Sequence, residues 1–232
     1  MLILEPLQHF YQSQPFDINS IERLICGDRY TAVLLKNGNI GVAANLQNKV
    51  KLTLHDFQIP KLEDIQHRIV LNAYYNALFN YMIPNLPHLD IFSAIKFSDY
   101  HQIVMIGFFR PLVSKFNNNQ IPLTIFDLYE QDEAITPIEQ QNQYLHKADC
   151  VILSATSIAN NTFINIVNAT PDNCNIFILG PSSIIHPDMK LYRNVKYIFG
   201  SIFNNNDEIP LDLINKGYST RDFLKYGKKV MF

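Results

Sequence analysis

The chain has 232 residues, of which 47% are hydrophobic and 17% are charged, so it is long enough for one large domain or two modest ones with a sizeable core. Its 19 basic and 21 acidic residues give a net charge of −2, which provides no positive surface for a nucleic-acid backbone or an anionic membrane. We therefore expect no nucleic-acid partner and no membrane partner.

The sequence carries no recognisable signal for export or membrane insertion. The apolar run near its middle, Ile103 to Phe109, is far shorter than the about 20 residues that a membrane-spanning helix needs. The first residues lack a basic segment before their apolar positions, and no small-residue cleavage site follows them. We expect a cytoplasmic protein.

Cysteine and histidine spacing predicts no preformed metal site. The three cysteines, Cys26, Cys150 and Cys174, are odd in number and stand far apart beside apolar residues, unlike a disulfide framework or a zinc motif. The seven histidines are scattered, and no two form an H-x-x-x-H pair. We expect the cysteines to be thiols in the core.

The N-terminal part begins with a helix over Leu2–Gln12 and continues with three short apolar runs, Ile21–Cys26, Tyr30–Leu35 and Ile40–Asn45. The last two runs flank an Asn-Gly pair, which is the strongest short signal for a hairpin because both residues tolerate positive φ. The three runs therefore predict an antiparallel meander.

A long amphipathic helix is predicted over Leu62–Met82, where apolar residues recur every three or four positions. One narrow side of this helix is polar, and it could be an edge exposed to solvent or a polar wall of a cleft; we favour the solvent edge. The row consists of Arg68, Asn72, Asn76 and Asn80.

The segment Pro84–His88 holds two prolines, cannot continue a helix, and predicts a boundary between domains 1–86 and 87–232. After it, short apolar runs alternate with helix-length segments, which predicts an α/β fold with a mainly parallel sheet. The expected strands are His101–Gly107, Leu123–Asp127, Cys150–Leu153, Ile176–Leu179 and Lys196–Phe199. The expected helices lie near Leu112–Asn117, Pro137–His146, Thr162–Ala169 and Asp207–Lys216.

Small polar residues follow two of these strands and mark the expected site. The strand Asp149–Leu153 runs into the loop Ser154–Thr162, and the strand Asn175–Leu179 runs into Gly180–Ser183. Ligands of open parallel sheets bind beyond the carboxyl ends of the strands, so the loops at these ends are the expected binding site. Asn160 could cap a helix or help to present backbone N–H groups to an anion.

Two other strand ends carry candidate residues without a complete motif. Gly107 follows its strand as the first glycine of a dinucleotide fold would, but no G-x-G-x-x-G follows, so a standard NAD enzyme is not expected. Asp127 could meet a ribose hydroxyl or be a solvated loop acid. Ser182 and His186 lack a third partner, so no catalytic residue is assigned.

In its order of motifs the sequence resembles the family described as "Putative heavy-metal chelation", and the resemblance covers nearly the whole chain. It is carried by Gly27–Val33, Gly41–Ala43, Val104–Phe109, Asp149–Thr162 and Gly180–Ser183. The resemblance implies an enolase N-terminal-like α+β domain over residues 1–86, a Rossmann-like domain over 87–232, and a site in the cleft between them with a role in binding metal.

The sequence departs from the family pattern at four positions. Phe108 stands where the family commonly has a histidine, and Arg110 stands where an apolar residue or proline is usual. Asp127 replaces a common glutamate, and Ala155 replaces a common glycine. Loss of an imidazole weakens metal binding in particular, because neutral imidazole is the commonest metal ligand.

We therefore expect the interdomain cleft to bind a small molecule or a metal complex, with a divalent or heavy metal ion as the only cofactor that the resemblance suggests. The alternatives are an enzyme using a nucleotide or S-adenosylmethionine-like cofactor, and a scaffold whose cleft serves a partner in a homodimer. The expected site residues are Asn45, Gly107, Phe108, Asp127, Thr156, Asn160, Thr162, Gly180, Pro181, Ser182 and Ser183.

Overall fold

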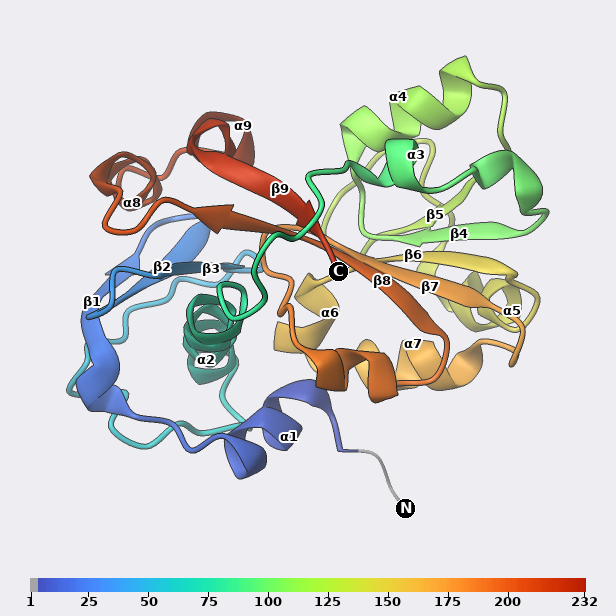
Figure 1. The fold of residues 1–232 in the computed structure, drawn as a ribbon. Helices are drawn as coiled ribbons and strands as arrows, with labels where there is room; N and C mark the ends of the chain where they lie inside the picture. Colours follow the sequence, from blue (N-terminus) through green and yellow to red (C-terminus); the bar gives the residue numbers. More distant parts are fainter. Residues whose placement is uncertain (1–3) are drawn as a thin grey trace.

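A computed structural model describes residues 4–232 and shows a mixed α/β fold with two sheets (Figure 1). The smaller sheet is the predicted antiparallel meander of β1 (Ile21–Cys26), β2 (Tyr30–Leu35) and β3 (Ile40–Ala44). The Asn-Gly turn joins β2 to β3, with Gly38 at φ +89°. The hairpin predicted from this local signal is confirmed.

The larger sheet has six strands in the order β5-β4-β6-β7-β8-β9, and all neighbours are parallel except β8 and β9. This is a doubly wound order: β5 is added on one side of β4, and the later strands are added on the other side, starting with β6. Such sheets bind ligands at the point where the strand order reverses, here between β4 and β6. The predicted mainly parallel sheet is confirmed. Its strands are β4 (Ile103–Ile106), β5 (Thr124–Phe126), β6 (Cys150–Ser154), β7 (Asn175–Leu179), β8 (Val195–Phe203) and β9 (Gly227–Met231).

Helices cover both faces of the larger sheet, as Figure 1 shows. Helices α3 (Ile91–Ala94) and α4 (Arg110–Asn118) lie on one face, and α5 (Gln141–Leu145) and α7 (Phe163–Ala169) lie on the other. Successive strand residues point to opposite faces of the sheet: in β4, Met105 packs in the core under α3 and α4, and Val104 packs in the core under α5 and α7. Because helices bury these strands on both faces, their sequences are continuous apolar runs.

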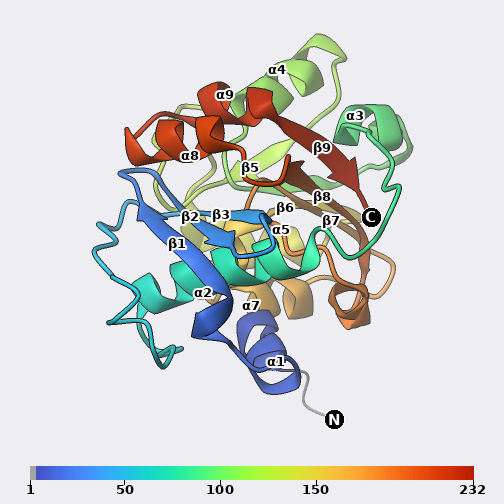
Figure 2. The same ribbon diagram turned by 60° about the vertical axis from the view of Figure 1, so that its left-hand side comes forward.

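The smaller sheet is covered on both faces by helices from distant parts of the chain (Figure 2). Helix α2 (Ile65–Phe79) packs on one face, and α8 (Glu208–Asn215) and α9 (Thr220–Phe223) pack on the other. Phe203 and Phe223 share a core with Ala32 and Val42. The C-terminal helices therefore complete the core of the N-terminal sheet.

Helix α1 (Pro6–Ser13) begins at its proline, and Glu5 caps it by accepting from two backbone N–H groups. The start of the predicted helix, residues 2 and 3, lies outside the described residues. Helix α4 ends at Asn118, one residue beyond the end expected from the sequence. The remaining short elements are α6 (Thr156–Ala159), η1 (Ile18–Ser20), η2 (Phe97–Asp99), η3 (Ile138–Gln140), η4 (Pro187–Leu191) and η5 (Leu224–Tyr226).

Helix length and polarity bear on the expectation that the chain has no membrane-spanning segment. Over residues 4–232, every helix is too short or too polar to pass through a lipid bilayer.

Candidate functional site

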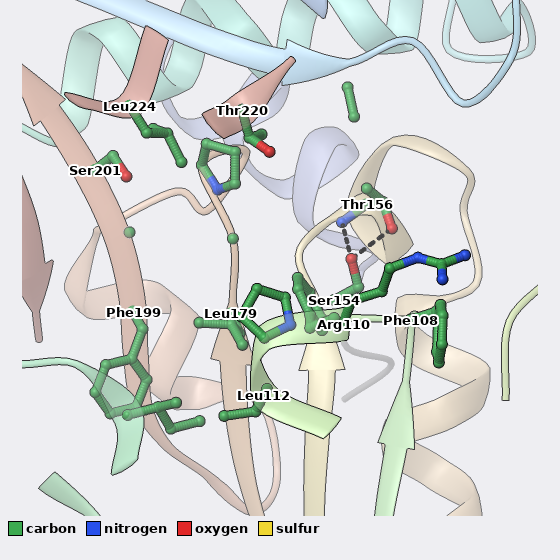
Figure 3. A pocket seen from close by; sticks show the side chains of 18 of the residues that line it. Phe108, Arg110, Leu112, Ser154, Thr156, Leu179, Phe199, Ser201, Thr220 and Leu224 are labelled. Atoms are coloured by element: carbon green, nitrogen blue, oxygen red, sulfur yellow. Dashed lines mark hydrogen bonds between the residues drawn. The ribbon is translucent and has the colours of Figure 1, made fainter. Parts of the chain in front are cut away.

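A cavity of about 650 Å³ opens at the carboxyl ends of the central strands of the large sheet (Figure 3). Its floor is apolar and includes Leu112, Leu179 and Phe199. Polar side chains stand at opposite ends of the floor. Ser154 and Thr156 form one end, where their hydroxyl oxygens are 2.8 Å apart, Ser201 lies at the other end, and Thr220 lies between them in this view. The cavity thus lies where the strand order reverses.

Six of the eleven expected site residues line this cavity, and five do not. The lining residues among them are Gly107, Phe108, Asp127, Thr156, Gly180 and Pro181. The other five, Asn45, Asn160, Thr162, Ser182 and Ser183, make hydrogen bonds within the protein instead.

The hydrogen bonds of these five residues hold backbone segments together. Buried Asn45 accepts from the Thr31 hydroxyl and donates to the Gly27 carbonyl. Asn160 accepts from the backbone N–H and the hydroxyl of Thr162, which makes a local turn rather than an anion site. Asn45 therefore holds backbone segments together and does not line this cavity.

The loop that holds the two serines is also tied down by hydrogen bonds. The Ser182 hydroxyl oxygen accepts from the Ala44 N–H at 3.0 Å, and the Ser183 hydroxyl donates to the Phe199 carbonyl at 2.9 Å. Both serines are buried. These contacts place Gly180 and Pro181, which precede them, at the cavity.

Gly107 and Asp127 together fix the turn after β4. Gly107 has φ +102°, and a Cβ built on it would lie 2.7 Å from the Ser154 Cβ, so only glycine fits. The Asp127 carboxylate accepts from the Phe108 N–H at 2.7 Å and from the N–H groups of Tyr129 and Glu130. Three backbone donors therefore hold the half-buried Asp127 carboxylate and use most of its acceptor capacity.

Gly180 exposes its backbone to the cavity. Its φ is +132°, and the nearest heavy atom to a Cβ built there is 3.9 Å away. Glycine is favoured at this position by the positive φ and not by a clash between a Cβ and neighbouring atoms. A ligand can therefore approach this backbone closely.

The polar row of α2 is buried, and the predicted solvent edge is wrong. Arg68 is only 5% exposed, and Asn72, Asn76 and Asn80 are less exposed still. None of the four lines the cavity, so the row is not a wall of the cleft either. Its side chains instead bind the backbone of the loops that follow β6 and β7.

Arg68 uses all five of its N–H donors. Its guanidinium donates to both oxygens of Glu5 at 3.1 and 2.9 Å, to the Leu62 carbonyl at 3.2 Å, and to the carbonyls of Ile158 and Ala159 at 2.7 Å each. The last two contacts anchor α6, the helical turn that carries Thr156 into the cavity.

The three asparagines of the row bind the loop after β7. Asn76 donates to the carbonyls of Pro181 and Ser183 at 2.9 and 2.8 Å, and its Oδ1 accepts from the Val42 N–H at 3.2 Å. Asn72 donates to the Ser182 carbonyl, and Asn80 donates to the Ser183 carbonyl. The row therefore connects the small sheet to the loop that carries Gly180.

The charged residues of the lining come partly from segments that the sequence did not indicate. The Arg110 guanidinium lies 4.9 Å above the centre of the Phe108 ring and 3.5 Å from both Glu130 and Asp132. Lys115 pairs with Asp90 at 3.2 Å. Two more lining cations, Arg221 of α9 and Lys229 of β9, come from the C-terminal segment. Strand β9 was not predicted because Gly-Lys-Lys lacks an apolar pattern.

The thiol and carboxylate groups of the described residues do not form a site for a bare heavy-metal ion. Among residues 4–232, no three His, Cys, Asp or Glu side chains are grouped closely enough to hold a metal ion. Cys150 and Cys174 are buried, and desolvation raises the pKa of Cys174 to about 12 and raises the pKa of Cys150 as well. Thiolate is the form that binds a soft metal, and burial opposes its formation.

These pKa shifts predict that native Cys150 and Cys174 resist alkylation near neutral pH. Cys26 is half-buried and is expected to be the only cysteine to react, slowly because burial also raises its pKa. Mass spectrometry after iodoacetamide treatment would count the modified thiols, with urea-unfolded protein as the control for full labelling. Rapid native labelling of Cys150 or Cys174 would contradict the prediction.

Comparison with known proteins agrees with this fold. The family model described as "Putative heavy-metal chelation" (DUF364) matches residues 90–232. A comparison with curated proteins finds no match.

Two solved structures of proteins of unknown function from the same family share the fold. The one from Pyrococcus horikoshii is 22% identical over 91% of this chain and 92% of its own, with a TM-score of 0.78. The one from Desulfitobacterium hafniense DCB-2 is 16% identical over 97% of this chain and 99% of its own, with a TM-score of 0.74. Because the family model covers more than half of the chain, this protein belongs to the "Putative heavy-metal chelation" family.

Proposed function

We propose that the protein binds a small organic molecule in the cavity at the carboxyl ends of the central strands, and that a metal ion enters only as a complex with that molecule. The observation that carries the proposal is the cavity itself, with an apolar floor between two polar ends at the reversal of strand order. A volume of about 650 Å³ is within the usual range for small-molecule sites.

The donor groups of the lining support an organic ligand over a bare ion. Hydroxyls, the exposed backbone of Gly180 and apolar side chains are suited to an oxygen-rich molecule, whereas the carboxylate of Asp127 is already occupied. A metal complex would present its organic shell to these groups. This reconciles the family description with the chemistry of the side chains.

A second candidate is an enzyme with a nucleotide or S-adenosylmethionine-like cofactor. The observation that favours it is the turn at Gly107, which follows β4 at the reversal of strand order as in cofactor-binding sheets. Asp127 would then support the turn and would not be the main acceptor for a ribose hydroxyl. A thermal-shift panel of nucleotides and S-adenosylmethionine would show stabilisation under this candidate and none without it.

The predicted division into residues 1–86 and 87–232 is part of the proposal, with the cavity between an enolase-like part and a Rossmann-like part. The two separate sheets and the proline-containing segment between them support this division, and α8 and α9 of the second part pack back on the sheet of the first. The homodimer and the cytoplasmic location stay predictions.

The test combines native mass spectrometry with a cavity-filling variant. Protein purified under mild conditions is expected to carry a small molecule, alone or with a metal, that elemental analysis and mass spectrometry identify. Thr156→Trp would fill the cavity and is expected to abolish this retention. Thr162→Trp changes a residue of the same loop outside the lining and serves as the matched control. Equal retention by both folded variants would place the ligand elsewhere and overturn the proposal.

A further inference from the structure

We infer that the ligand of this cavity carries an acidic oxygen group, a carboxylate or a phosphate, bound by Arg221 and Lys229; the inference rests on the proposed function and specifies the chemistry of the ligand. It is carried by the positions of the charged side chains around the cavity and by the polar groups beside them.

The lining holds four basic residues and three acidic ones, and most of them are already engaged with one another. Lys115 pairs with Asp90, and Arg110 lies between the carboxylates of Glu130 and Asp132. Asp127, the remaining acid, accepts from three backbone N–H groups.

Two cations of the lining stay without a protein counter-ion. Within residues 4–232, neither Arg221 nor Lys229 forms an ion pair, although both line the cavity. Both have only hydrogen-bond donors, so the group that they bind must be an acceptor. A charged acceptor forms the stronger hydrogen bonds with them.

Arg221 and Lys229 both belong to the C-terminal segment that borders the cavity. Lys229 is directly opposite Ser201 in the β8–β9 ladder, which puts the two side chains on one face of the sheet. Arg221 follows Thr220, whose hydroxyl also lines the cavity. The hydroxyl groups of Ser201 and Thr220, which line the cavity together with these two cations, can also donate to an anion.

Tyr30 adds a neutral polar group at the cavity. It lines the cavity, and burial raises the pKa of its phenol to about 12, so it keeps its proton at physiological pH. A protonated phenol does not repel an anion. The apolar floor of Leu179 and Phe199 then contacts the carbon skeleton of the ligand.

The same arrangement repels a bare metal cation from the part of the cavity that Arg221 and Lys229 line. Unpaired positive charge at the cavity lowers the local concentration of cations and raises that of anions. A metal could therefore reach the cavity as an anionic complex, which is consistent with the proposed function.

Three probes of the same shape test the inference: benzoate, phenyl phosphate and neutral benzamide. Dissociation constants would be measured by ligand-observed NMR on the full chain. At least one acidic probe is expected to bind about tenfold or more tightly than benzamide, because only an acidic probe brings a charge opposite to those of Arg221 and Lys229. The stronger acidic probe identifies whether the subsite prefers a carboxylate or a phosphate.

A pair of double variants gives the control. Arg221→Gln with Lys229→Gln is expected to remove the preference by weakening the acidic probes about tenfold or more and benzamide much less. Lys225→Gln with Lys228→Gln makes the same change in net charge at exposed residues outside the lining and should keep the preference. Added salt should weaken the acidic probes alone.

Three results would overturn the inference: equal affinity for benzamide and both acids, equal losses in the two double variants, or no binding of any probe. None of them overturns the proposed function, which depends on the molecule retained by the wild type and lost from Thr156→Trp. Loss of that retained molecule from Arg221→Gln with Lys229→Gln, but not from the control pair, would support both.

Discussion

Replacing Arg68 with methionine is expected to lower the free energy of unfolding by about 3–5 kcal/mol, because it leaves the buried Glu5 carboxylate without its counter-ion. The pair is bidentate, and its side chains are only 5% and 14% exposed. The same change also removes the donors to the Ile158 and Ala159 carbonyls, which lie in a buried turn. Urea unfolding would measure the loss by circular dichroism or by the fluorescence of the 12 tyrosines, since the chain has no tryptophan.

An exposed pair of the same chemistry provides the matched control. Arg23 binds both oxygens of Glu208, but its side chain is 43% exposed and that of Glu208 is 67% exposed. Arg23→Met should therefore cost less than about 1 kcal/mol. Arg68→Lys should remain unstable, because an ammonium group cannot reproduce five donors in a planar fork. Equal stability of Arg68→Met and Arg23→Met would contradict the prediction.

The effect of Arg68 should extend to the cavity. Two of its three carbonyl acceptors, Ile158 and Ala159, lie in α6, and the same turn begins with Thr156, which lines the cavity. Arg68→Met is therefore expected to weaken ligand retention even under conditions where the chain stays folded. Arg23→Met should not.

Elements specified by local chemistry were predictable from the sequence. The hairpin follows from Asn-Gly, the long helix from apolar residues at spacings of three and four, and the parallel strands from short buried runs. The position of the cavity also follows from a general rule, since ligands bind beyond the carboxyl ends of such strands. This is why Gly107, Thr156 and Gly180 were found without knowledge of the tertiary structure.

Features that depend on contacts between distant segments were not predictable. The row on α2 has the same polar sequence whether it faces solvent or the protein interior. Only the packing shows that its partners are backbone carbonyls rather than water. Likewise, Gly-Lys-Lys at the start of β9 becomes a strand by pairing with β8, and the lysines suit an edge strand. Missing β9 meant that Lys229 was not recognised as part of the lining.

The same limit applies to the serines of the loop after β7. Ser182 and Ser183 are adjacent to the lining residue Pro181, yet both side chains turn into the protein. Sequence position alone cannot separate the side of a loop that faces a cavity from the side that holds the loop in place. Residue type gives no help, because a hydroxyl suits both roles.

Asn76→Ala is the second large effect that we expect, with a loss of about 2–4 kcal/mol in the free energy of unfolding, because it leaves buried backbone groups without partners. Strand β3 is an edge of the small sheet, and its Val42 N–H is satisfied by the Asn76 Oδ1. The Asn76 amide also donates to the Pro181 and Ser183 carbonyls. One side chain thus connects the edge strand to the loop of the cavity.

Urea unfolding would compare this variant with Asn165→Ala, which removes an exposed asparagine from α7 and should change stability by less than about 0.5 kcal/mol. Asn76→Asp is expected to be at least as destabilising as Asn76→Ala at neutral pH, since it places a carboxylate against two carbonyl oxygens. Ligand retention should fall with Asn76→Ala, because Gly180 and Pro181 lose the contact that positions their loop. Equal stability and retention in Asn76→Ala and Asn165→Ala would show that the buried row neither supports the fold nor positions the site.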